Sequence, residues 1–131
     1  MRQVLFKLHC PSPRQAVEQI RIHLARDDRF KRVADDVFLA VVEAIGNVVE
    51  HTAAQYTVSV TLNKKRITVD LIDYGKGFRL HGRMMPPLFA ESGRGIPIMQ
   101  SIMDSVEYKQ GKHSNRLRLL KNLTPRSGRQ P

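Results

Sequence analysis

The sequence has a single cysteine, no long apolar run and no acidic residue near its C-terminal end. One cysteine, Cys10, cannot form an internal disulfide or build a four-ligand metal site, which excludes a disulfide-stabilised secreted scaffold and a zinc finger. The longest apolar run, residues 37–42, is far shorter than the ~20 residues that span a bilayer. The first residues alternate and lack the apolar stretch of a signal peptide. We therefore expect a cytoplasmic protein without membrane contact, whose 131 residues form one core.

The segment from Tyr108 to Pro131 contains seven basic residues and no acidic residue. The rest of the chain carries fifteen basic and twelve acidic residues, so most of the formal net charge of +10 is C-terminal. We expect a domain of residues 1–121 and a basic, disordered tail of residues 122–131. The near balance of charge in the domain, and the lack of aromatic residues among the tail's basic ones, argue against direct nucleic-acid binding.

Hydrophobic periodicity predicts an α+β protein. Ser12 followed by Pro13 is typical of a helix start, and residues 27–31 are expected to be a charged connection before a second helix. The predicted strands are residues 2–9, 56–62, 67–73, 106–108 and 116–120, and the predicted helices are residues 13–26, 33–53 and 93–103. Residues 74–92 form a long loop. This order favours a two-layer α/β sandwich, a mixed, mostly antiparallel sheet with helices on one face.

The long helix contains a polar pair, Glu43 and Asn47, spaced four residues apart so that both side chains share one face. Asparagine is a weak helix former, and Gly46 costs roughly 1 kcal/mol relative to alanine. One interpretation is a carboxylate and an amide that face a polar cavity, where Gly46 lets another group approach. The other is an exposed strip of an amphipathic helix. The residues alone leave both open.

A second polar feature is the run Asp73-Tyr74-Gly75-Lys76-Gly77, which follows a predicted strand. Strand parity places Asp73 on the same side as the apolar residues that begin at Ile67. If that side faces the core, an unpaired carboxylate is costly unless a ligand offers N–H donors. The adenine amino group is such a donor, whereas guanine presents a carbonyl there. Gly75 and Gly77 permit close backbone approaches, and an ordinary Asp-x-Gly turn is the alternative.

The third feature is Gly93-Arg94-Gly95 at the start of a predicted helix. Free N–H groups at a helix start favour anions, so this segment is a candidate phosphate cradle to which Arg94 adds charge. A Walker A loop, Gly-x₄-Gly-Lys-Ser/Thr, is absent from the sequence.

The order and spacing of these three features resemble the ATP-site boxes shared by histidine kinases, gyrase, Hsp90 and MutL. Within that family, the chain is similar to the small bacterial anti-sigma-factor serine-protein kinases. The segments that carry this closer resemblance are Val41–His51, Gly93–Met99 and Met103–Tyr108. The resemblance covers about residues 3–121.

The resemblance implies a role for each motif residue. Asn47 would coordinate the Mg²⁺ that bridges the phosphates, and Asp73 would accept a hydrogen bond from the adenine amino group. Glu43 would be the general base that takes the proton from a substrate serine. Residues 78–92 would form a lid over ATP. The other nucleotide-binding residues that it implies are His51, Gly75, Gly77, Gly93, Arg94 and Gly95.

The sequence departs from the family pattern in two places. Members usually carry a Gly-Thr pair before the last strand, near the adenine, and here His113-Ser114-Asn115 takes that place. Ser114 is the candidate to replace the threonine hydroxyl. Glu91 lies where some members have a basic residue, for which Arg94 could compensate. Both changes concern the rate of catalysis more than ATP binding.

The resemblance therefore implies a serine-protein kinase that uses Mg-ATP and acts as an anti-sigma-type switch. Such a protein binds a sigma factor or another regulator, phosphorylates a STAS-domain antagonist on serine and is commonly a homodimer. The alternative, which the altered third box favours, is an ATP/ADP-dependent protein-binding module with little or no kinase activity.

Overall fold

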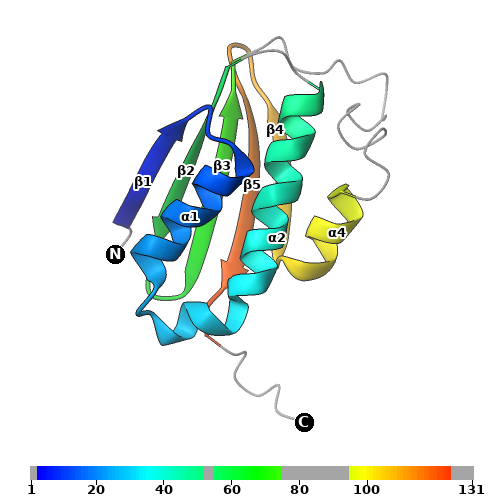
Figure 1. Ribbon diagram of the computed structural model, residues 1–131. Coiled ribbons are helices and arrows are strands. Elements are labelled where there is room, and N and C mark those ends of the chain that lie inside the picture. Colours follow the sequence, from blue (N-terminus) through cyan, green and yellow to red (C-terminus); the bar gives the residue numbers. More distant parts are fainter. Residues whose placement is uncertain (1–2, 52–54, 75–94, 125–131) are drawn as a thin grey trace.

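The computed structural model describes residues 3–51, 55–74 and 95–124 and has two layers, a five-stranded sheet and three helices on one face of it (Figure 1). In chain order the elements are β1 (Gln3–His9), α1 (Pro13–Leu24), α2 (Asp28–His51), β2 (Tyr56–Leu62), β3 (Arg66–Asp73), α4 (Gly95–Ile102), β4 (Ser105–Gln110) and β5 (Asn115–Asn122). The predicted α+β sandwich is confirmed. Among the helices that the structure describes, none is long and apolar enough to cross a membrane.

The sheet has the strand order β1-β2-β3-β5-β4, so the last strand of the chain, β5, lies between β3 and β4. All four pairings of described strands are antiparallel, whereas the sequence predicted a mixed sheet. In the ladder between β3 and β5, Arg66 lies opposite Asn122 at one end and Asp73 opposite Asn115 at the other. The register therefore places two polar residues side by side where β3 ends.

The hydrophobic core lies between the sheet and the helices. Alternate residues of the central strands, such as Val58, Val69 and Leu119, are fully buried, as are Val41 and Ile45 of α2. Burying a side chain of this size contributes about 1.5–3 kcal/mol. The helix α2 packs against both α1 and α4 and contacts the central strands β3 and β5, whereas α1 contacts β1 and α4 contacts β4 at the edges of the sheet.

The starts of α1 and α2 are fixed by side-chain caps. The Ser12 hydroxyl accepts a hydrogen bond from the Gln15 N–H at 3.1 Å, and the Gln15 side chain accepts one from the Ser12 N–H at 2.8 Å. This capping box confirms the predicted start of α1. The expected connection at residues 27–31 is wrong, because α2 begins at Asp28. Asp27 Oδ1 accepts hydrogen bonds from two backbone N–H groups of the first turn of α2, at 2.9 and 3.1 Å. This cap explains why residues 28–31 are helical although they are charged and lack a hydrophobic period.

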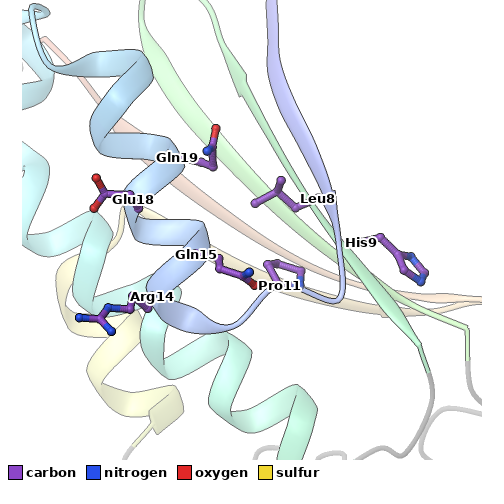
Figure 2. A pocket seen from close by; sticks show the side chains of 7 residues that line it. All are labelled: Leu8, His9, Pro11, Arg14, Gln15, Glu18 and Gln19. Atoms are coloured by element: carbon purple, nitrogen blue, oxygen red, sulfur yellow. The ribbon is translucent and has the colours of Figure 1, made fainter.

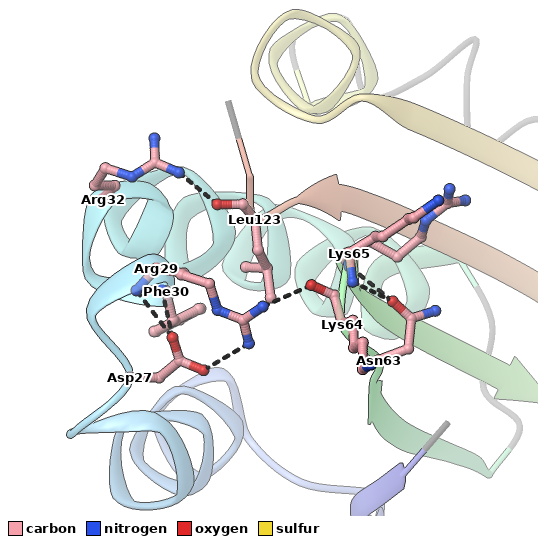
Figure 3. A network of polar contacts seen from close by, with 9 residues as sticks. Asp27, Arg29, Phe30, Arg32, Asn63, Lys64, Lys65 and Leu123 are labelled. Carbon is pink, nitrogen blue, oxygen red and sulfur yellow. Dashed lines mark hydrogen bonds and ion pairs between the residues drawn. The ribbon is translucent and has the colours of Figure 1, made fainter. Parts of the chain in front are cut away.

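Figure 3 shows how the start of α2 is tied to two other segments. Arg29 binds the Asp27 carboxylate at 3.3 Å and donates to the Lys64 carbonyl in the turn between β2 and β3 at 2.6 Å. Arg32 donates to the carbonyl of Leu123, whose side chain is fully buried just after β5. These contacts fix one end of α2 over the sheet.

We expect Asp27→Ala to lower the free energy of unfolding at pH 7 by about 1–2 kcal/mol, because it removes the cap of α2. Burial acts to raise the pKa of Asp27, but hydrogen bonds from Arg29 and Phe30 and the Arg29 charge outweigh it and hold the pKa below 3.8. A carboxylate with a lowered pKa stabilises the fold above its unfolded-state pKa and loses this effect as pH falls through the folded-state value. The difference from wild type should therefore shrink below pH 3.8.

Urea unfolding at several pH values measures this effect. Asp27→Asn is the matched control, since asparagine caps a helix about as well as aspartate. Asp27→Asn should retain most of the stability at pH 7, and an Asp27→Ala variant as stable as wild type would show that the cap contributes nothing.

Candidate functional site

Asp73 and Asn115 form a buried polar pair at the end of the sheet. Asp73 is the last residue of β3 and Asn115 the first of β5, and they lie opposite each other in the ladder. Asn115 Nδ2 donates a hydrogen bond to Asp73 Oδ1 at 2.9 Å. Asn115 is 1% exposed and Asp73 is 6% exposed. The prediction from strand parity, that Asp73 is turned toward the core, is confirmed.

The other polar side-chain atom of Asn115, Oδ1, has no partner among the described residues. Asn115 Oδ1 is buried, and no hydrogen-bond donor reaches it within the described part of the chain. A buried acceptor left in this state costs about 1–3 kcal/mol. A ligand that supplied an N–H group at this position would remove that cost.

Tyr108 of β4 adds to the electrostatics of this end. The tyrosine lies opposite Leu117 in the sheet, on the same side as Asn115, and is half-buried. Burial raises the pKa of Tyr108 well above its ordinary value, and the negative charge of Asp73 raises it further. The phenol therefore stays protonated and neutral at any physiological pH.

Asn47 supplies a second unsatisfied amide, from the helix layer. It lies in the C-terminal half of α2 and is only 5% exposed, and its Nδ2 is buried without an acceptor in residues 3–51, 55–74 and 95–124. Glu43, one turn earlier, is half-buried. The face of α2 that carries Glu43 and Asn47 is therefore turned toward the interior of the protein at Asn47. Gly46 is exposed, and a Cβ added there would meet no described atom within 4 Å, so no described residue makes the close approach that Gly46 was expected to allow.

Three of the elements that carry the predicted site residues reach one end of the molecule. Figure 1 shows the end of β3, the start of β5 and the C-terminal end of α2 at this end, and α4 beside α2 nearer the middle. Gly95 is the first residue of α4, and His51 is the last residue of α2. The predicted nucleotide-binding residues Gly75, Gly77, Gly93 and Arg94, and the predicted lid at 78–92, lie outside the described residues.

Sequence reasoning missed Asn115. The Ser114 carbonyl accepts from the Gly111 N–H at 2.8 Å in the turn between β4 and β5, and a Cβ on Gly111 would lie 2.6 Å from that oxygen. Ser114 belongs to this turn, and the next residue contacts Asp73. A signal was present in the sequence, because Asn115 shares the strand parity of the apolar residues Leu117 and Leu119.

A groove of about 470 Å³ lies elsewhere, between the end of β1 and α1 (Figure 2). Gln15 and Gln19 project from α1 toward Pro11 and Leu8. The residues that line the groove are Leu8, His9, Pro11, Arg14, Gln15, Glu18 and Gln19. None of them is among the described residues that carry a buried, unpaired polar side-chain atom. Because Asn115 beside Asp73 and Asn47 on α2 do carry such atoms, we take these residues, and not the groove, as the candidate site.

Comparison with known proteins gives a family match over most of the chain. The model of the histidine kinase-like ATPase domain matches residues 10–121. An anti-sigma F factor of Clostridium acetobutylicum is 28% identical over 88 residues, which are 60% of this chain and 62% of the relative. One from Thermoanaerobacter pseudethanolicus is 31% identical over 91 residues, 62% of this chain and 63% of the relative. The chain thus spans less than two thirds of the length of these relatives.

Two solved structures share the fold. The RsbU and RsbW domains of a Mycobacterium tuberculosis protein align with a TM-score of 0.61 at 18% identity, over 88% of this chain and 32% of that one. The Acinetobacter baumannii histidine kinase AdeS aligns with a TM-score of 0.57 at 10% identity, over 95% of this chain and 68% of that one.

The two buried amides should respond in opposite directions to truncation in the absence of any ligand. Asn47→Ala removes a buried donor that has no acceptor and introduces a better helix former, so the free energy of unfolding should stay equal or rise by about 0.5–1 kcal/mol. Asn115→Ala removes the donor to the Asp73 carboxylate and should lower it by about 1.5–3 kcal/mol. Urea unfolding of both variants beside wild type measures the contrast. A loss above about 1 kcal/mol for Asn47→Ala would mean that its amide has a structural partner.

Proposed function

Because the chain belongs to the histidine kinase-like ATPase domain family, which implies ATP binding, we propose that the end of the sheet carrying Asp73 and Asn115 is its ATP site. The observation that carries this proposal is the set of unsatisfied buried groups at that end. Asn47 offers a donor and Asn115 an acceptor, and neither has a partner among the residues that the structure describes. A nucleotide has phosphate oxygens for the first and an amino group for the second, so these residues fit the ligand that the family implies.

The adenine base would lie against Asp73. Its carboxylate is buried, at the end of a strand whose inward face is otherwise apolar. A carboxylate has about four lone-pair sites, so it can accept from the adenine amino group while it accepts from Asn115. Guanine would bring a carbonyl oxygen toward the same acceptor, which disfavours GTP. Gly75 and Gly77 would let the backbone pass close to the base.

The phosphates and Mg²⁺ would lie between α2 and the start of α4. No group of three His, Cys, Asp or Glu side chains in residues 3–51, 55–74 and 95–124 is arranged to hold a metal. This suits Mg²⁺ in nucleotide sites, where few protein ligands join the phosphate oxygens and water. We assign the Asn47 side-chain oxygen as the protein ligand and its Nδ2 as a donor to phosphate. Gly93, Arg94 and Gly95 would bind the phosphates at the start of α4, with His51 nearby.

The bound Mg-ATP would supply the phosphoryl group, and Glu43 would act on the acceptor. Glu43 lies one turn before Asn47 on α2 and is half-buried, so it is reachable from outside while close to the proposed metal ligand. Its carboxylate would take the proton from a substrate serine as the serine oxygen bonds to the γ-phosphorus and the bond to ADP breaks. General base catalysis of this kind contributes about 10²–10⁴-fold in rate.

The proposed partners follow from the names of the relatives, which are anti-sigma F factors. We propose that the protein binds a sigma factor or another regulator in the cytoplasm, acts as a homodimer and phosphorylates a STAS-domain antagonist on serine. A second candidate is a nucleotide-dependent binding module with little kinase activity. The replacement of the usual Gly-Thr pair, with Asn115 beside Asp73, favours this candidate because it alters the site near the base.

Two substitutions on α2 separate binding from catalysis. Glu43→Gln keeps the size of the side chain and removes the proton acceptor, so Mg-ATP affinity should stay within a few-fold while phosphate transfer falls by about 10²-fold or more. Asn47→Ala removes the metal ligand and should weaken Mg-ATP binding by more than ~10-fold. Calorimetry with Mg-ATP and radiolabel transfer to a STAS-domain protein from the same genome measure the two effects.

Asp35→Asn is the matched control, since Asp35 is an exposed carboxylate on the same helix, and it should change neither quantity. If the Glu43→Gln variant transfers phosphate at the wild-type rate, Glu43 is not the general base. ATP binding without transfer in the wild type would favour the binding module, and no binding of Mg-ATP would contradict the proposed site.

A further inference from the structure

The helix α2 carries apolar residues on its outward side as well as on its core side. Leu39, Val42 and Val49 are 43%, 39% and 57% exposed, and Gly46 between them is exposed too. The spacing of these four positions alternates between three and four residues, so they form one row along the helix, which we refer to as the α2 row. Single exposed apolar residues are ordinary on a protein surface, whereas an aligned set is typical of a surface that binds another protein.

The α2 row is turned away from the sheet, on the middle helix of its layer (Figure 1). The residues between the row positions are fully buried and face the core: Ala40, Val41, Ala44 and Ile45. On one side of the row, Phe38 lies under the Arg21 guanidinium of α1, 4.8 Å from the ring centroid. From Leu39 to Val49 the row is about 15 Å long. This length is enough to contact about three turns of a second helix.

Gly46 lies within the row and weakens the helix that carries it. Glycine is a poor helix former, and the helical backbone at this position is one that any better helix former adopts. The fold does not need the missing side chain, since no described atom lies within 4 Å of the place where a Cβ would be. A chain that approaches from outside would use it, because glycine lets another backbone come closer. The α2 row is therefore an apolar strip with a notch.

Charge beside the α2 row selects the kind of partner. Val42 and Val49 are each followed by a glutamate, and these two, Glu43 and Glu50, are seven residues and about 10 Å apart on one flank of the row. Charged residues at such positions choose a partner helix by opposite charge. In an antiparallel pair of two copies, the glutamate flanks of both α2 helices would face each other, so like charges oppose a second copy. A partner helix with an apolar face and a basic flank is favoured instead.

We propose that the α2 row docks the protein that accepts the phosphate, through an apolar helix face with basic flanking residues. This inference rests on the proposed function and names the surface at which that acceptor protein binds. Glu43 connects the two, because the proposed general base directly follows Val42 of the row. A helix that lies along the row holds one flank beside Glu43, where an acceptor serine is needed, and a basic side chain against Glu50. The metal ligand, the base and the docking surface then all belong to α2.

Gly46→Gln tests the proposal, because it should move stability and binding in opposite directions. Glutamine is the better helix former, so the urea midpoint of unfolding should rise. The same side chain fills the notch, so the Kd for the STAS-domain protein from the same genome should rise by about 10-fold or more. Calorimetry with and without a non-hydrolysable Mg-ATP analogue measures this Kd. The affinity for the analogue itself should stay within about twofold of wild type, since Gly46 is outside the proposed ATP site.

Two further variants control for the nature of the change. Leu39→Gln removes an apolar side chain of the row with little change in helix propensity, and it should raise the Kd by about fivefold or more. Ile22→Gln is the matched control, since Ile22 is 59% exposed on α1 and does not belong to the row. It should keep the wild-type Kd.

The predicted basic flank of the partner is tested by Glu50→Lys. This variant should bind the STAS-domain protein more weakly than wild type, and wild-type binding should weaken as the salt concentration rises from about 0.05 to about 0.3 M. Tighter binding by Glu50→Lys would overturn the proposed chemistry of the partner. Sedimentation of each row variant reports on the other occupant. A changed oligomeric state with an unchanged Kd would assign the row to a second copy and overturn the proposal.

The outcomes separate this proposal from the proposed function. If Gly46→Gln is folded and binds the STAS-domain protein as tightly as wild type, the docking surface is wrong and the ATP site is untouched. If the wild type binds Mg-ATP but not the STAS-domain protein, the docking proposal and the proposed substrate are both rejected, and the ATP site remains. If the wild type does not bind Mg-ATP, the ATP site is contradicted, and the Kd values measured without nucleotide still decide where the acceptor protein docks.

Discussion

The antiparallel ladder between β3 and β5 is the constraint on which the rest of the structure depends. Its register runs without a break from Arg66 opposite Asn122 to Asp73 opposite Asn115. A shift by one residue would turn each inward side chain outward. It would remove apolar residues from beneath α2 and separate the Asp73–Asn115 pair. On the other face it would break the two hydrogen bonds, of 2.7 and 3.0 Å, that Arg118 donates to Asp70. The core and the candidate site are thus fixed by one set of backbone contacts.

The candidate site costs stability in the absence of a ligand. Asn47 and Asn115 each carry a buried polar atom that no described residue satisfies, and alanine at position 47 would be a better helix former. Groups of this kind are retained when they serve a ligand, since selection for function tolerates a loss of stability. A nucleotide offers both the acceptor and the donor that are missing, which agrees with the membership of the chain in the histidine kinase-like ATPase domain family. The fold and the function are therefore connected through unsatisfied hydrogen bonds.

Much of the fold could be predicted because the strands around the core alternate cleanly, and β2 has the bounds that its pattern predicts. The start of α2 could not, because its first turn is charged and is held by the Asp27 cap and by contacts with distant segments. Strand parity correctly predicted the burial of Asp73. Asn115 was missed because its role depends on the strand that lies opposite, and a single sequence does not reveal that pairing. Asn47 is a different case, since its spacing from Glu43 is compatible with both an exposed strip and a buried site, and only its burial in the structure decides between them.

The central claim is that the unsatisfied amides at one end of the sheet exist to bind a nucleotide. The chain has four asparagines, and two of them, Asn63 and Asn122, lie at the opposite end of the sheet. Side-chain amide resonances of ¹⁵N-labelled protein, assigned with single substitutions, therefore report on both ends in one spectrum. On addition of Mg-ATP, the resonances of Asn47 and Asn115 should shift while those of Asn63 and Asn122 stay in place. Unmoved resonances of Asn47 and Asn115 at saturating Mg-ATP would contradict the account.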